Sequence, residues 1–293
     1  MTYKFGFVIL HYLSVEDTIE CVESIIKNID IINYKIFIVD NHSPDHSGNY
    51  LINKYIDNER VCVILNEKNL GFSRGNNRGI TIAKEQNCDF IIVLNNDTVL
   101  FQTHFTDAIV SEYHYSKFGV LGPKVLDPDG INTSSPLSVL PDYSASTLYG
   151  NMKIWRRKYY KCMFGLEYLH RKKTKPTIEI AKKDTFDYDK RAENVEIHGC
   201  CLIFSPRFFN FMDGFEELTF MYGEESILKM NCDKYNLPII YNPELEIFHK
   251  EAITTKKERR NRKGQLAFYK RMWKAAEAIY KKAKKRSNVC NNG

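Results

Sequence analysis

Three polar segments carry the side chains best suited to chemistry, and each comes shortly after an apolar run of strand length. Asp40 follows one run, the glycine-bearing segment Asn69–Asn77 comes after a second, and Asp97 comes after a third. In an open parallel sheet, ligands bind where the strands end at their carboxyl side. We therefore expect these segments to share one site, although each aspartate alone could equally cap a loop or a helix start.

The residue types in these segments suit a nucleotide diphosphate. Asp40 can accept hydrogen bonds from a base or a ribose, Gly71 permits close approach of the backbone, and Arg74 carries a charge that can meet phosphate. Asp97 offers a hard oxygen ligand for Mg²⁺ or Mn²⁺. A nicotinamide site is excluded, because no GxGxxG motif follows the first apolar run, Phe5–Leu10.

Apolar runs and amphipathic stretches alternate over the first hundred residues. The runs lie at residues 5–10, 36–39, 61–65 and 90–94, and stretches of helical period lie at 15–28, 48–56 and 73–85. Strands joined by helices in this way form right-handed βαβ units. We therefore predict an α/β fold with a mostly parallel central sheet flanked by helices.

The pattern loosens beyond residue 100. We expect a helix over 103–115, an extended segment over 119–126, a long basic loop near 140–190, a strand within 195–204, a helix over 224–235, short strands at 238–241 and 245–248, and a basic amphipathic helix over 265–285. The last helix carries an apolar stripe, which is formed by Leu266, Tyr269, Trp273, Ala276, Tyr280 and Ala283.

Composition and charge narrow the class of protein. The 293 residues fit one large domain or two small ones, and no apolar run approaches the ~20 residues of a membrane-spanning helix. No secretory signal is visible and the eight cysteines show no metal-like spacing, so we expect a reduced, cytoplasmic compartment. Residues 256–286 hold 14 Lys or Arg against two acids, which leaves 28 basic and 34 acidic side chains elsewhere.

Eight short motifs run in order along most of the chain. They are FVILHY (7–12), IVDNHS (38–43), NLGFSRGNNRG (69–79), LNNDT (94–98), HGCCLIFS (198–205), DGFEE (213–217), MYGEE (221–225) and IFHK (247–250). Their order and spacing resemble the bacterial family 2 glycosyltransferases with the A-type nucleotide-sugar fold, and among these the rhamnosyltransferase-like members.

The resemblance implies an inverting, metal-dependent glycosyltransferase that moves a sugar from a nucleotide-diphosphate sugar to a hydroxyl of a glycan acceptor in bacterial surface polysaccharide synthesis. We expect one catalytic domain over residues 1–255, with a nucleotide-binding half over 1–100 and an acceptor half over 101–255. A basic helical tail over 256–293 follows it.

The resemblance also assigns roles to single residues. Asp40 matches the aspartate that contacts the base, Asp97 and His249 match metal ligands, and one of Glu224 and Glu225 matches the catalytic base. The further nucleotide-sugar contacts are expected from Asn41, Asn69, Gly71, Arg74, Asn76, Asn95 and Asn96. Two departures stand out: Asn95 replaces the first acid of the metal motif, and Glu225 stands where aspartate is usual.

Simpler interpretations of these residues remain open. Glu224 and Glu225 could merely favour the positive end of a helix, although a partly desolvated carboxylate beside a like charge suits a general base. His249 could be a satisfied histidine at a strand end. The apolar stripe of the tail could pack on the body and leave its lysines in water.

The sequence leaves two rival functions to weigh and suggests two further partners. A sugar nucleotidyltransferase would need a glycine-rich basic loop after the first strand, and residues 11–14 lack one. A nucleic-acid-binding protein would fit the tail but not the acidic remainder, so no nucleic acid is expected.

We expect the 256–286 tail to meet an anionic membrane at the inner face of the plasma membrane, near a polyprenyl-diphosphate-linked acceptor.

Overall fold

A computed structural model describes residues 3–128, 135–138, 141–165, 186–250 and 261–290, and it forms two compact units. One unit comprises Met1–Pro141, Tyr188–Phe220 and Glu224–Glu251, and the other comprises Asp142–Asp187, Met221–Gly223 and Ala252–Gly293.

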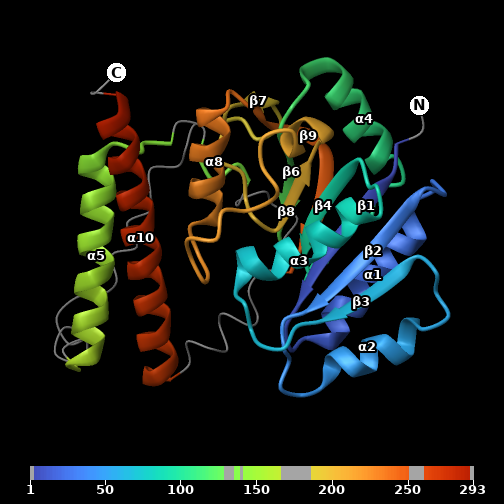
Figure 1. Cartoon of the computed structure of the whole chain (residues 1–293), viewed down its shortest axis with the longest axis horizontal. Coiled ribbons are helices and arrows are strands. Elements are labelled where there is room, and N and C mark those ends of the chain that lie inside the picture. Colours follow the sequence, from blue (N-terminus) through green and yellow to red (C-terminus); the bar gives the residue numbers. More distant parts are fainter. Residues whose placement is uncertain (1–2, 129–134, 139–140, 166–185, 251–260, 291–293) are drawn as a thin grey trace. The chain divides into compact units, whose positions relative to one another are not determined.

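The first unit is built on a mixed sheet in the order β3-β2-β1-β4-β8-β6-β9-β5, with β7 paired to β9 (Figure 1). Its strands are β1 (Phe5–His11), β2 (Tyr34–Asp40), β3 (Val61–Leu65), β4 (Phe90–Asn95), β5 (Thr98–Val99), β6 (Val120–Leu126), β7 (Ala192–Glu193), β8 (Cys201–Phe204) and β9 (Ile239–His249). Its helices are α1 (Val15–Asn28), α2 (Ser47–Tyr55), α3 (Phe72–Glu85), α4 (Phe105–Ser116), α7 (Pro206–Phe209) and α8 (Glu224–Lys234).

The parallel part of the sheet is the part that the alternating pattern predicts. β3, β2, β1 and β4 are neighbours and pair in parallel. Phe7, Val8 and Ile9 of β1 are all fully buried, so both faces of this strand are covered, as its unbroken apolar run indicates. The register places His11 beside Asp40 and Leu10 beside Asn95, so the strand ends that carry polar residues lie level with one another.

The remaining strands make the sheet mixed. β8 pairs antiparallel with both β4 and β6, and β9 runs parallel to β6. β9 is one continuous strand, whereas the sequence suggests two. The two expected segments lie on either side of Pro243, and the strand passes this residue at a shift of register opposite Pro123 and Lys124. The short strand β5 pairs with the end of β9 and sets Thr98 opposite His249.

The second unit is a pair of helices, α5 (Ala145–Met163) and α10 (Arg262–Cys290). The long loop expected near 140–190 is thus a helix over the range of α5, and it groups with the tail rather than with the acceptor half. Ring contacts join Tyr149 to Tyr280 and Tyr159 to Trp273, so the helices run in opposite directions. α5 was missed because only Leu148 and Cys162 of its side chains are buried, which leaves almost no helical period in its sequence.

The buried stripe of α10 differs from the expected one. Its buried members are Phe268, Ala275, Ile279 and Ala283, while the remaining residues of the expected stripe are only partly buried. The segment 221–223 belongs to this unit, because the Tyr222 ring packs edge-on against Phe268. Among the described residues, no helix has the length and apolarity that crossing a bilayer requires.

Candidate active site

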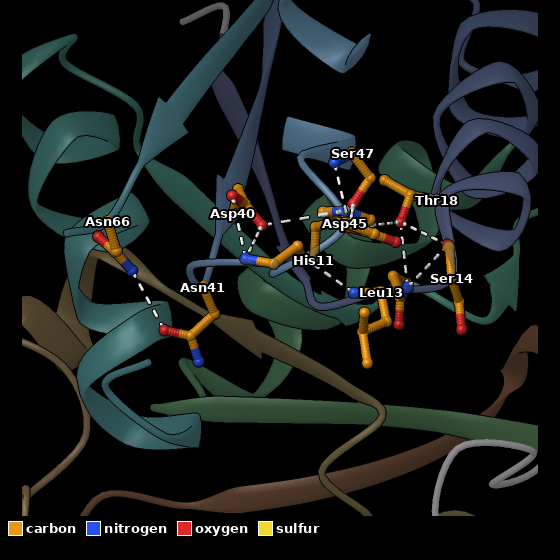
Figure 2. Close-up of polar contacts among 11 residues, drawn as sticks. His11, Leu13, Ser14, Thr18, Asp40, Asn41, Asp45, Ser47 and Asn66 are labelled. Carbon is orange, nitrogen blue, oxygen red and sulfur yellow. Dashed lines mark hydrogen bonds and ion pairs between the residues drawn. The ribbon is translucent and has the colours of Figure 1, made fainter. Parts of the chain in front are cut away.

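Asp40 is held firmly at the end of β2. Its carboxylate accepts hydrogen bonds from the backbone N–H of Ser43 (3.1 Å to Oδ1), and its side chain is largely buried. His11 lies beside it at the end of β1, with Nε2 4.0 Å from Oδ1 of Asp40 (Figure 2). A Cβ at Gly48 would lie 2.4 Å from Oδ2 of Asp40, so the absence of a side chain there leaves room for this carboxylate.

A buried network connects His11 to the segment before Asp97. His11 Nδ1 lies 2.7 Å from the Thr18 hydroxyl and Nε2 lies 2.8 Å from the Ser47 hydroxyl (Figure 2). Asn96 Nδ2 donates to the same Thr18 oxygen (3.0 Å). Burial lowers the pKa of His11 although the charge of Asp40 opposes this, so the ring is kept neutral. The sequence analysis did not select His11; a lone histidine at the end of an apolar strand was the available signal.

The predicted asparagines after β2 and β3 hold a loop in place. Asn41 Nδ2 donates to Asn69 Oδ1 (3.0 Å) and to the Gly71 carbonyl (3.1 Å), and Asn66 donates to Asn41 Oδ1 (3.3 Å; Figure 2). Gly71 has a φ of +79°, and a Cβ there would lie 2.0 Å from the Phe220 carbonyl oxygen. Only glycine therefore fits this turn, and the amide groups of Asn41 and Asn69 already bond within the protein.

Arg74 and Asn76 lie on the first turns of α3 and differ in exposure. Arg74 is exposed and its Nε donates to Glu217 (3.0 Å). An exposed pair of this kind contributes little to stability, so the guanidinium can exchange to a phosphate. Asn76 is fully buried, its Nδ2 donates to the Phe72 carbonyl (3.1 Å), and its Oδ1 has no partner among the described residues.

Asp97 and His249 are brought together by the pairing of β5 with β9. His249 Nε2 lies 3.1 Å from Asp97 Oδ1, and both side chains are largely buried. Burial alone would raise the pKa of Asp97, but the hydrogen bond and charge of His249 outweigh it and lower that pKa. Asp97 is therefore ionised at neutral pH.

This pair fits a divalent cation. Two adjacent ligand atoms on an octahedral ion with bonds of about 2.1 Å lie about 3 Å apart, which is close to the 3.1 Å between Asp97 and His249. His249 Nδ1 is buried without a hydrogen-bond partner among the described residues, so it can carry the ring proton while Nε2 offers a lone pair to a metal. A site with one carboxylate and one imidazole ligand suits Mn²⁺ and can also bind Mg²⁺.

Both predicted glutamates start helix α8. Glu224 is buried and accepts a hydrogen bond from the Thr219 hydroxyl (3.3 Å). Glu225 accepts a backbone hydrogen bond from Gly199, and a Cβ at Gly199 would lie only 2.7 Å from its Oε1. Burial raises the pKa of Glu225, which suits a proton acceptor in an enzyme that works near neutral pH.

The segment His198–Cys200 lies close to both Asp97 and Glu225. Donor atoms of His198, Cys200 and His249 all lie within 4.8 Å of one another. Burial and the nearby charges of Asp97 and Glu225 raise the pKa of the Cys200 thiol. Burial, with the charge of His249, lowers the pKa of His198 to about 4. The motif HGCC marks this segment in the sequence, but its part in the site depends on the antiparallel pairing of β4 and β8, which the sequence does not reveal.

The two ends of the site are separated by one strand. Asp40 ends β2 and Asp97 follows β4, and β1 lies between these strands. Neighbouring strands lie about 4.8 Å apart, so β2 and β4 are roughly 10 Å apart across the sheet. That spacing suits the base at one end of a nucleotide and the diphosphate at the other.

Residues 7–136 match the family model described as Glycosyl transferase family 2. The matched residues run from β1 to the segment after β6 and make up less than half of the chain. No curated protein is close enough in sequence to count as a match.

Several solved structures share the fold. The structure of GalNAc-T7 with UDP, GalNAc and Mn²⁺ is 14% identical with a TM-score of 0.58, and the match covers 86% of this chain and 44% of that one. The structure of S. aureus TarS 1–349 in complex with UDP is 13% identical with a TM-score of 0.52, over 91% and 65% of the two chains. The mixed sheet flanked by helices is thus the A-type glycosyltransferase fold, and this chain spans less than two thirds of the length of either structure.

Proposed function

We propose that this protein is an inverting, metal-dependent glycosyltransferase that uses a nucleotide-diphosphate sugar. The observation that carries the proposal is the meeting of Asp97, His249 and Glu225 around the segment His198–Cys200. The proposed metal ligands and the proposed base then lie near the same short segment. The match of residues 7–136 to family 2 supports the same assignment.

Each group has a task in the transfer. Glu225 takes the proton of an acceptor hydroxyl, whose oxygen forms the new bond to the sugar C1. The bond from C1 to the diphosphate oxygen breaks at the same time, and its electron pair leaves with the nucleoside diphosphate. Attack from the opposite face inverts the anomeric centre. A positioned base supplies about 10²- to 10⁴-fold in rate.

A divalent ion would be held by Asp97 and His249 and would supply positive charge for the leaving diphosphate. Around it, this chain's own residues position the nucleotide. Asp40 is oriented by Ser43 and His11 to accept hydrogen bonds from the base or ribose. Arg74 lies exposed on the first turns of α3, where it can leave Glu217 for a phosphate oxygen.

A thermal-shift panel of nucleotide sugars, each with and without Mn²⁺, tests the proposal. A donor that binds only the folded protein raises the melting temperature, by an amount that grows with its concentration over Kd. We expect at least one donor to do so only with Mn²⁺, and Asp97→Ala to remove the shift. Asp107→Ala is the matched control, because Asp107 is an exposed acid on α4. No shift with any donor would contradict the proposal.

The finer assignment concerns the acceptor. The motif order that resembles rhamnosyltransferase-like members supports transfer of rhamnose or another hexose during bacterial surface polysaccharide synthesis. The helix pair α5 and α10 is rich in lysine, arginine and aromatic side chains, and Tyr149, Tyr160 and Phe164 are exposed on α5. Such a surface suits an anionic membrane and a polyprenyl-diphosphate-linked acceptor at the inner face of the plasma membrane.

Cosedimentation with vesicles tests the membrane assignment. We expect binding to phosphatidylglycerol vesicles at low salt and none to phosphatidylcholine vesicles. Lys284→Ala with Lys285→Ala should weaken binding, because each exposed lysine near an anionic surface contributes about 1 kcal/mol. The control pair is Lys27→Ala with Lys54→Ala on the sheet unit. Equal recovery of protein with both vesicle types, or with neither, would contradict the assignment.

A further inference from the structure

We propose that His198 binds the diphosphate of the donor through its Nε2–H, as a neutral hydrogen-bond donor beside the metal ligands. The inference rests on the proposed function and adds a residue that the motif comparison does not assign.

The fold brings His198 to the diphosphate end of the site. β8 begins at Cys201 and pairs antiparallel with β4, with Cys201 opposite Leu94. The segment before β8 therefore lies beside the segment after β4, which leads to Asp97. The His198 and His249 rings lie 5.6 Å apart between centroids, so His198 adjoins the proposed metal ligands.

A hydrogen bond fixes which nitrogen of His198 carries the proton. The backbone N–H of Cys200 donates to His198 Nδ1 (3.1 Å), which must therefore present a lone pair. In a neutral imidazole the proton is then on Nε2. His198 is only partly buried, and no hydrogen bond to its Nε2 is found within the described part of the chain. This N–H is available to a ligand.

The same bond argues against His198 as a metal ligand. Donor atoms of His198, Cys200 and His249 lie within 4.8 Å of one another, which by itself would allow a three-ligand cation site. A ligand nitrogen needs a free lone pair, but Nδ1 of His198 already accepts from Cys200 and Nε2 of the neutral ring carries the proton. The cation is then left to Asp97 and His249, and His198 serves as a donor next to it.

The neighbouring residues favour the diphosphate over the acceptor as the oxygen that His198 binds. Gly199, the next residue, bonds the Glu225 carboxylate, so the acceptor hydroxyl belongs on that side of the segment. The His198 ring instead adjoins His249. Negative charge builds up on the diphosphate as the sugar leaves, and a preorganised N–H near such an oxygen stabilises it most.

Titration calorimetry with UDP as the probe, in saturating Mn²⁺, tests the inference. A hydrogen bond to a charged group is worth roughly ten- to a hundredfold in affinity, so His198→Ala should weaken UDP binding by that factor. His198→Gln retains an N–H donor and should recover part of the loss. His104→Ala removes an exposed imidazole on the sheet unit and should leave UDP affinity unchanged.

Binding of Mn²⁺ alone, followed by electron paramagnetic resonance, separates the two roles of His198. A hydrogen-bond donor to the diphosphate predicts equal Mn²⁺ affinity in wild type, His198→Ala and His198→Gln. Loss of Mn²⁺ affinity in both variants would overturn the inference in favour of a metal ligand. UDP affinity in His198→Ala equal to that of the wild type would overturn this inference alone. Failure of the wild type to bind UDP, GDP or dTDP would overturn the proposed function together with it.

Discussion

Replacing Gly199 by alanine should displace the proposed base without touching the metal ligands. A Cβ at this position would lie 2.7 Å from Oε1 of Glu225 and 3.3 Å from its Cδ. The group that must move is the carboxylate at the far end of the flexible Glu225 side chain. The Cγ of Glu225 already lies at an ordinary contact distance, 3.6 Å from the added Cβ. The fold therefore tolerates Gly199→Ala, and Glu225 moves.

The size of the effect follows from the overlap. Ordinary van der Waals contact begins near 3.4 Å, so the carboxylate must retreat by about 0.7 Å from its 2.7 Å position. A misplacement of about 1 Å can cost about 10²-fold in rate. We expect kcat to fall on the order of 10- to 100-fold. The free energy of unfolding should change by about 1 kcal/mol or less, as is usual where no buried group is left unpaired.

Steady-state kinetics with the best donor, together with UDP binding, measures the two effects separately. UDP affinity should match the wild type, because Asp97 and His249 are unaffected. Gly150→Ala is the matched control: nothing lies within 4 Å of its Cβ position on α5, so kcat should not change. A kcat for Gly199→Ala within twofold of the wild type would refute the role given to Glu225, as would a parallel loss of UDP affinity.

Four further predictions concern the same site. Asp97→Ala should lower Mn²⁺ affinity more than tenfold by electron paramagnetic resonance, and unchanged affinity would remove Asp97 from the metal site. Glu225→Gln should lower the rate of transfer about 10²- to 10⁴-fold while leaving UDP affinity within about twofold. Burial raises the pKa of Glu225, so the loss of wild-type rate on acidification should begin at a higher pH than it would with an ordinary glutamate, whose pKa is about 4.3. A pH–rate profile whose acid limb has its midpoint at or below that value would contradict this. His11→Phe should lower the free energy of unfolding in urea by about 1–3 kcal/mol, because it removes the two buried hydrogen bonds of His11 to the Thr18 and Ser47 hydroxyls; an unchanged urea midpoint would be the contrary result.

The parallel half of the sheet could be predicted from the sequence because its signals are local. Each buried strand of the parallel sheet is an unbroken apolar run, and the strand ends are marked by polar residues such as Asp40 and Asp97. Parallel pairing then aligns those ends, whatever the order of the strands. Gly71 was likewise visible in advance, and its φ of +79° shows why a glycine is needed there.

The rest depends on packing that leaves little trace in the sequence. α5 buries only Leu148 and Cys162, so its helical period is almost invisible. The antiparallel pairing of β8 with β4 decides that the segment 198–200 meets Asp97 and Glu225, and nothing in the run HGCCLIFS specifies a partner strand. Local propensity also cannot show that the tail helix covers α5 with a stripe centred on Phe268 and Ala275.

Release of nucleoside diphosphate from a panel of nucleotide sugars, followed over time with Mn²⁺ present, tests the central claim most directly. The claim is that Asp97, His249 and Glu225 act together on one donor. It predicts that the wild type releases the diphosphate from at least one donor, that chelation of the metal stops the release, and that Asp97→Ala and Glu225→Gln lower it at least tenfold. Release that persists undiminished in both variants, or no release from any donor by folded protein, would contradict the claim.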